Sequence, residues 1–200
     1  MTAEDSFTVL RTSLDNILNS SPKFLLLGIG ENRMGDDGAG QYITFNLDRF
    51  NQLPNLLIIN GGITPEERLQ EIIDFQSELM LILDVIDLPG DPGTIGIFEE
   101  SQMLNYLPIS SHSMPLPVFV DRCRHYIPHI QMKLLGIKPF SLEFLDHYSL
   151  FQEDKYDLDA KESNPNIPFY DFNLTESMKE ICDRIVNIFS EIIDKYYIQD

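Results

Sequence analysis

The chain has 200 residues, of which 43% are hydrophobic, 23% charged and 10% aromatic, a composition typical of a globular protein. It carries 14 Lys and Arg residues against 32 Asp and Glu residues, and the resulting net charge of −18 would repel nucleic-acid phosphates and anionic lipid head groups. Two cysteines exclude a disulfide scaffold, and no apolar run approaches the roughly 20 residues of a membrane span. We therefore expect a single domain over 1–200, with no nucleic-acid partner and no membrane insertion. The acidic N-terminal residues are unlike a signal peptide, which favours a cytoplasmic location.

The first predicted element is an amphipathic helix at about residues 7–18, where Phe7, Leu10 and Leu14 recur at helical spacing. After it, short apolar runs alternate with segments of helical character. The predicted strands are 24–30, 56–59, 79–83, 94–98 and 132–137, and the predicted helices are 38–50, a helix opening at 64, 117–126 and 175–197. This alternation predicts an α/β fold, a three-layer α/β/α sandwich around a mostly parallel twisted sheet of about five strands.

The helix that opens at Thr64 has a particular start signal. Thr64 is expected to be its N-cap, Pro65 its first residue and Glu67 the second half of a capping box.

Residues 151–172 are polar and show no apolar period, which predicts an insertion loop without secondary structure. Two interpretations remain open for it: a flap or partner-docking segment, or a surface loop with no role. In either case we expect removal of 154–166 to leave the stability of the fold unchanged.

Candidate functional residues follow the predicted strands, because ligands of open α/β sheets bind beyond the carboxyl ends of the strands. The first strand leads into the glycine-rich run 28–40, which contains Asp36 and Asp37, and the third strand ends at Asp84. His112 lies in a later loop. Phosphate-binding motifs fit this pattern poorly, since Asp36 and Asp37 stand where a P-loop has Lys and Ser or Thr, and the third glycine of a dinucleotide fingerprint is missing.

Each of these residues also has a purely structural interpretation. For Asp36, helix capping is the favoured one. For Asp37, capping competes with a role as a ligand, because the glycines around it leave room for close approach. Asp84 ends a strand expected to be buried on both faces, where an unpaired carboxylate is costly, and this favours a functional role. The remaining histidines and both cysteines are expected to be structural, the cysteines as buried apolar groups: His125, His129, His147, Cys123 and Cys182.

Taken together, Asp37, Asp84 and His112 can converge at one edge of the sheet. Two carboxylates and an imidazole are a suitable set for a borderline divalent metal with open coordination positions.

Five segments in order along the chain resemble the nickel-iron hydrogenase maturation endopeptidases. The resemblance extends over about residues 23–145 and the final helix, and it is nearest to the branch that processes formate- or energy-converting-type hydrogenases. The segments are 28–40 with Gly35-Asp36-Asp37-Gly38, 61–66 with Gly-Gly-Ile-Thr-Pro-Glu, 81–85 ending in Asp84-Val85, 112–116 with His-Ser-Met-Pro-Leu, and 135–139.

The resemblance implies a hydrolase, either an aspartic-type or a nickel-dependent peptidase, that removes a C-terminal extension from a hydrogenase large-subunit precursor after nickel insertion. The family's metal-contacting positions fall on Asp37, Asp84 and His112, and the first two are the expected catalytic residues. Nickel is expected to arrive with the precursor, and no organic cofactor is expected.

Two positions depart from the family pattern. Glu31 stands where the family usually has Asn, and Asn60 replaces a frequent Asp before Gly61. The sequence also leaves open a non-catalytic, nickel-sensing chaperone of the same precursor, and a nucleotide-binding domain as a weaker alternative.

Overall fold

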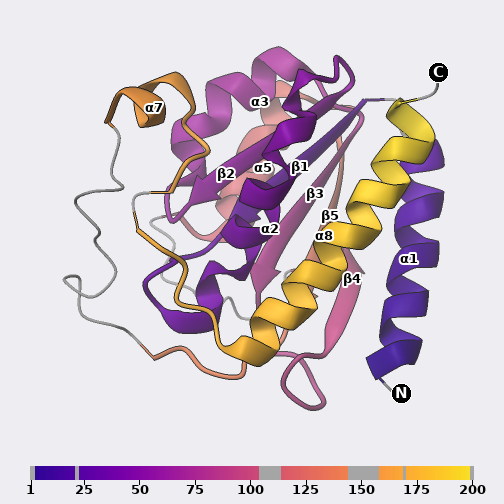
Figure 1. Ribbon diagram of the computed structural model, residues 1–200. Helices are drawn as coiled ribbons and strands as arrows, with labels where there is room; N and C mark the ends of the chain where they lie inside the picture. Colours follow the sequence, from indigo (N-terminus) through magenta and orange to yellow (C-terminus); the bar gives the residue numbers. More distant parts are fainter. Residues whose placement is uncertain (1–2, 21–22, 104–113, 144–157, 169, 199–200) are drawn as a thin grey trace.

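The computed structural model describes residues 3–20, 23–103, 114–143, 158–168 and 170–198, and its centre is a five-stranded sheet with the order β2-β1-β3-β5-β4 (Figure 1). Four strands are parallel, and β4 is antiparallel to its neighbour β5. The strands are β1 (Phe24–Ile29), β2 (Leu56–Gly62), β3 (Leu79–Val85), β4 (Ile95–Glu99) and β5 (Gln131–Ile137). The sheet thus has the predicted number of strands and the predicted mainly parallel direction.

Helices cover both faces of this sheet, as the predicted three-layer sandwich requires (Figure 1). One face carries α1 (Ala3–Ser20), α2 (Ala39–Leu47) and α8 (Glu176–Tyr197). The other carries α3 (Leu69–Phe75) and α5 (Leu116–Tyr126). The short helix α4 (Glu100–Met103) follows β4 directly.

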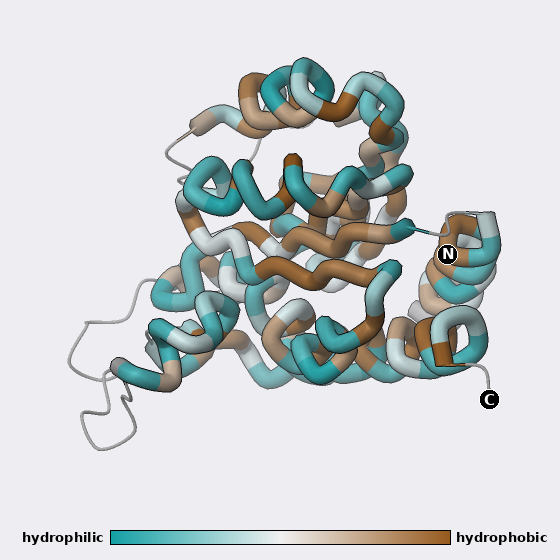
Figure 2. Tube along the Cα trace, turned by 90° about the horizontal axis from the view of Figure 1, so that it is seen from above, coloured by the Kyte–Doolittle hydropathy of each residue, from teal (hydrophilic) through white to brown (hydrophobic). Residues whose placement is uncertain are grey.

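The core consists of two apolar layers, one on each side of the sheet. Along β1, Phe24 and Leu26 pack on the face of α2 and α8, whereas Leu25 and Leu27 pack on the face of α3 and α5. Because both faces are covered, the central strands β1 and β3 are buried along their whole length and almost entirely apolar, and Figure 2 shows hydrophobic strand segments between more polar helices. This is why uninterrupted apolar runs identify the strands in the sequence.

Two predicted helices begin differently from expectation. The segment 38–50 is divided into a 3-10 turn η1 (Gly35–Gly38), α2 and a second turn η2 (Asp48–Gln52). The capping box at Thr64 is wrong: the chain there forms the 3-10 turn η3 (Pro65–Arg68), and the Thr64 side chain makes no capping hydrogen bond. The backbone N–H of Glu67 instead donates to the Thr64 carbonyl at 3.0 Å, as the tighter turn requires.

Glycines allow α2 to lie directly on the strand ends. A Cβ on Gly40 would lie 2.5 Å from the carbonyl oxygen of Leu83 and 2.6 Å from that of Ile29, and a Cβ on Gly28 would lie 2.2 Å from the carbonyl oxygen of Gly40. Side chains at these positions would push the helix away from β1 and β3. The glycine-rich run is therefore required for close packing of backbone on backbone.

Both cysteines are buried, as predicted. Burial raises the pKa of the Cys123 thiol to about 12. The pKa of Cys182 is also raised, first by burial and then by the carboxylates of Asp36 and Asp183. Both thiols therefore stay protonated at neutral pH.

The insertion 151–172 differs from its prediction, because its described part contains a short helix, α7 (Leu158–Ser163). The described helices include none with the length and apolar character needed to cross a bilayer.

Candidate functional site

Asp37 lies in η1, directly beyond the carboxyl end of β1, and its side chain has no exposed surface. The backbone N–H of Glu31 donates to Asp37 Oδ2 at 2.7 Å. Gly30 makes this contact possible: its φ is +132°, and a Cβ there would lie 1.9 Å from the Asp37 carbonyl oxygen. This backbone hydrogen bond fixes the carboxylate against the end of the strand.

Asp84 is the second buried acid at this edge of the sheet. It lies near the end of the central strand β3, is 1% exposed, and accepts a hydrogen bond from the Val85 backbone N–H on Oδ1 at 2.8 Å. The turn η1 packs against β3, so Asp37 and Asp84 belong to the same end of two neighbouring strands. This is the convergence that the strand-end argument predicts for these two residues.

The third predicted ligand, His112, lies outside the described residues. Within the described ranges, no three His, Cys, Asp or Glu side chains form a group that could hold a metal ion. The set of Asp37, Asp84 and His112 therefore stays a prediction. His147 also lies outside the described residues. His125 and His129 are exposed, and His129 just precedes β5, at the opposite edge of the sheet from Asp84.

Asp36, which precedes Asp37 in η1, has a different environment. Its fully buried carboxylate accepts four hydrogen bonds, all from residues distant in sequence. Oδ2 accepts from the backbone N–H groups of Phe140 and Ser141 at 2.8 and 3.0 Å, and Oδ1 accepts from the backbone N–H and the hydroxyl of Thr175 at 2.8 and 2.9 Å. Thr175 is in turn the N-cap of α8.

Asp36 therefore has a structural role, as predicted, but the predicted capping of its own helix is wrong. Its side chain makes no capping bond to η1, the turn that contains it. It instead joins that turn to the segment after β5 and to the start of α8.

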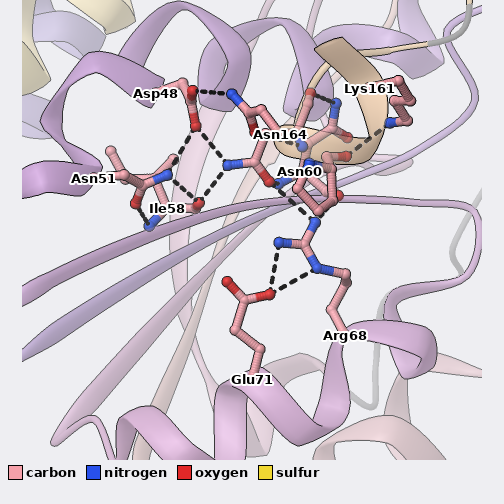
Figure 3. A network of polar contacts seen from close by, with 10 residues as sticks. Asp48, Asn51, Ile58, Asn60, Arg68, Glu71, Lys161 and Asn164 are labelled. Carbon is pink, nitrogen blue, oxygen red and sulfur yellow. Dashed lines mark hydrogen bonds and ion pairs between the residues drawn. The ribbon is translucent and has the colours of Figure 1, made fainter. Parts of the chain in front are cut away.

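The part of the insertion that follows α7 is held against β2 by the side chain of Asn166, which is 4% exposed. Its neighbour Asn164 lies beside Asp48 in the same network (Figure 3). Asn166 Oδ1 accepts from the Asn60 backbone N–H and from Arg68 Nη1, both at 3.0 Å. Nδ2 donates to Asp48 Oδ1 at 2.6 Å and to the Ile58 carbonyl at 2.8 Å. All four hydrogen-bonding positions of this amide are used. We call Asn166, with its neighbour Asn164, the asparagine clasp.

The clasp contradicts the expectation that the insertion is dispensable for stability. Asn164 Nδ2 donates to Asp48 Oδ2 at 2.6 Å, and Asn60 Nδ2 donates to the Asn166 carbonyl at 2.9 Å. The described part of the insertion is thus an integral part of the fold beside β2.

A cavity of about 400 Å³ lies between the insertion, where Lys161 and Pro165 line it, the loop after β1 and the loop after β2. Gln41, from α2, and Asn60, from β2, line it. Among the described residues, Gln41 Oε1 and Asn60 Oδ1 are buried and accept no hydrogen bond. Sequence analysis did not select Gln41. The only signal was a polar residue one helical turn after Asp37.

Three cationic side chains border this cavity, and each is engaged within the protein. Arg33 pairs with Glu31 and stacks over the Tyr170 ring, 5.0 Å from its centroid. Arg68 pairs with Glu71 at 2.6 Å. Lys161 Nζ donates to the carbonyls of Pro165 and Ile167. Burial, with a smaller effect of the Arg68 charge, lowers the pKa of Lys161.

Comparison with known proteins identifies the family. A sequence profile described as hydrogenase maturation protease matches residues 42–163, which is more than half of the chain. The chain belongs to the hydrogenase maturation protease family. The match includes Asp84 and His112 and begins just after Asp37.

Individual relatives agree with this placement of the protease. The hydrogenase 3 maturation protease of Escherichia coli K12 is 30% identical over 133 residues, which is 66% of this chain and 81% of that one. The crystal structure of a NiFe hydrogenase maturation protease HycI from Thermococcus kodakarensis KOD1 has a TM-score of 0.68 at 22% identity, covering 91% of this chain and 99% of that chain. The solution structure of an endopeptidase HycI from Escherichia coli has a TM-score of 0.59 at 24% identity and covers 82% and 87%. These two structures support the fold.

The contacts of Asp36 predict a large structural effect. Replacement by Ala leaves the backbone N–H groups of Phe140, Ser141 and Thr175 without their acceptor, and we expect Asp36→Ala to lower the free energy of unfolding by roughly 3–5 kcal/mol. Urea denaturation of the purified protease measures this. Asp87→Ala, at an exposed position, is the control and should lie within about 0.5 kcal/mol of wild type. An Asp36→Ala midpoint equal to that of wild type would contradict the assigned role.

A second prediction concerns the clasp. Asn166→Ala removes four side-chain hydrogen bonds beside β2, and we expect a loss of roughly 2–4 kcal/mol in the free energy of unfolding. Asn173→Ala is the matched control, because the Asn173 side chain makes one long hydrogen bond, to the Glu143 carbonyl at 3.4 Å. Equal denaturation midpoints for the two variants would mean that the insertion does not stabilise β2.

Proposed function

We propose that this protease is an endopeptidase that removes the C-terminal extension of a nickel-iron hydrogenase large-subunit precursor after nickel has been inserted. Family membership supplies the reaction class. We assign the active site to the carboxyl ends of two neighbouring strands because two buried carboxylates, Asp37 and Asp84, lie there. This pair lies at the carboxyl ends of parallel strands, where α/β proteins bind ligands.

In this proposal nickel belongs to the substrate. Asp37, Asp84 and His112 offer two oxygens and one nitrogen, an incomplete set that leaves positions for groups on the precursor. Such a set fits an ion that the precursor's cysteines already hold. The ion would orient and polarise the scissile peptide. In the alternative mechanism, Asp37 or Asp84 would activate water without a metal, as a general base.

In this proposal the partner is the large-subunit precursor, and family membership supports it. The net charge of −18 disfavours nucleic acid as a partner, and the expected location is the cytoplasm. No feature of the described residues favours a chaperone without catalysis.

The proposal predicts nickel-dependent processing. Incubation with nickel-loaded precursor should shorten the large subunit, as measured by intact-protein mass spectrometry, and nickel-free precursor should be spared. Brief chelator treatment of the protease, followed by desalting, should leave its activity unchanged because the ion arrives with the substrate. Cutting of nickel-free precursor, or activity lost on chelation and restored by zinc, would refute the proposed role of the substrate's nickel.

The site residues can be tested individually. Asp37→Asn and Asp84→Asn keep an oxygen for the Glu31 and Val85 backbone N–H groups, so cooperative unfolding should persist while processing falls by roughly 10²–10⁴-fold. His112→Ala should also block processing. The matched control is Asp87→Asn, three residues beyond Asp84 and exposed, which should process the precursor normally. Near-normal cleavage by Asp84→Asn would remove Asp84 from the site.

A further inference from the structure

The loop after β1, residues 30–34, lies against the turn that carries Asp37. The Glu31 N–H donates to Asp37 Oδ2 at 2.7 Å. A Cβ on Gly38 would lie only 2.8 Å from the Cα of Asn32, so the loop and η1 pack backbone against backbone. A shift of this loop would therefore change the support of the Asp37 carboxylate.

Asn32 joins this loop to a distant part of the chain at two points. Its Nδ2 donates to the Tyr170 carbonyl at 2.7 Å, and its own carbonyl accepts from the Asn173 backbone N–H at 3.2 Å. Asn32 is 5% exposed, so water competes little for these hydrogen bonds. One buried residue thus fastens the loop to the stretch of chain that leads into α8.

The residue after Asn32 strengthens the same contact. The Arg33 guanidinium lies over the Tyr170 ring, 5.0 Å from its centroid, and such cation–π contacts are attractive. Arg33 Nε also donates to Glu31 Oε1 at 2.8 Å. The ring of Tyr170 is therefore linked through Arg33 to the residue whose N–H holds Asp37.

The same stretch of chain also holds the turn. Thr175, five residues after Tyr170, donates to Asp36 from its backbone N–H and from its hydroxyl. The loop before η1 and the turn itself are thus both fastened to residues 170–175, with Asp37 between the two attachments. A reacting group has to be held closely in place, since a misplacement of about 1 Å can cost roughly a hundredfold in rate.

We propose that Asn32 is a positioning residue of this protease: by binding residues 170–175 it holds the loop after β1, so that the Glu31 N–H keeps the Asp37 carboxylate in its reactive orientation. This inference rests on the proposed function, since it takes Asp37 as a residue of the reaction. Asn32 acts through Glu31, so its loss should slow the chemical step and leave binding of the precursor unchanged.

Amide hydrogen exchange measures the positioning without any substrate. In the ¹⁵N-labelled full-length protease, Asn32→Ala should accelerate exchange of the Glu31 amide at least tenfold more than that of the Leu81 amide, which lies in the central strand β3 and follows global unfolding. Asn46→Ala is the matched control, because Asn46 Nδ2 makes the same kind of bond, to the Tyr42 carbonyl at 2.8 Å, within α2. It should leave the ratio of the two exchange rates unchanged.

Processing of nickel-loaded precursor gives the second readout. Asn32→Ala should lower kcat about tenfold and leave KM within about twofold of wild type, whereas a residue that only stabilises the fold would leave kcat unchanged below the thermal midpoint. Tyr170→Leu keeps the backbone carbonyl that Asn32 binds and removes the ring beneath Arg33. It should lower kcat about threefold, and it tests the contact even if Asn32→Ala does not fold.

Positioning and processing can fail separately. Equal acceleration of the Glu31 and Leu81 amides, or an unchanged kcat in both variants, would overturn the role of Asn32 even where wild-type protease shortens the precursor. Selective acceleration at Glu31, in a protease that leaves nickel-loaded precursor intact, would establish how Asp37 is held and refute the endopeptidase.

Discussion

The buried carboxylate of Asp36 is the interaction on which the geometry of the site depends. It receives hydrogen bonds from residues 104, 105 and 139 positions away, and so fixes η1 against the segment after β5 and the start of α8. Charge-assisted bonds of this kind are stronger than neutral ones, and burial removes competing water. Asp37 is the next residue in the chain, and its position follows from this anchoring. The two adjacent acids thus have different roles. Asp36 fixes the position of η1, and Asp37 lies beyond the carboxyl end of β1.

Close backbone packing is the second constraint. Gly28, Gly30 and Gly40 let the chain around η1 approach the ends of β1 and β3 to distances at which a Cβ would collide with carbonyl oxygens. This approach places one acid from the first loop and one from the central strand at the same edge. A glycine-rich run of this type suggests a phosphate site at first sight, but here it accommodates protein backbone and two carboxylates. The carboxylates at this edge favour a positively charged group over a phosphate.

The sheet, its mainly parallel direction and its buried cysteines could be predicted from the sequence because apolar runs are a local signal. The strand-end rule also selected Asp84 and Asp37 before their burial was known. The contacts of Asp36 and the asparagine clasp could not be predicted, since their partners lie more than a hundred residues away and Asn164 and Asn166 sit in a polar segment with no period. The prediction of a capped helix at Thr64 was wrong for a different reason. A capping-box sequence is compatible with either an α-helix or a 3-10 turn, and tertiary packing decides which of the two forms. His112 is a prediction from resemblance and lies outside the described residues.

The clasp has a consequence beyond the stability of one molecule. β2 is an edge strand, and an exposed edge is a template on which a strand of another chain can form. In this protein the side-chain amides of Asn51 and Asn166 both donate hydrogen bonds to the Ile58 carbonyl, and Asn51 Oδ1 accepts from the Ile58 N–H. Asn166 Oδ1 also accepts from the Asn60 N–H. The backbone groups in the middle of this edge are thereby engaged within the protein, and fewer of them are left to pair with a strand of another chain. The same asparagines that hold the insertion in place therefore also act against edge-to-edge aggregation.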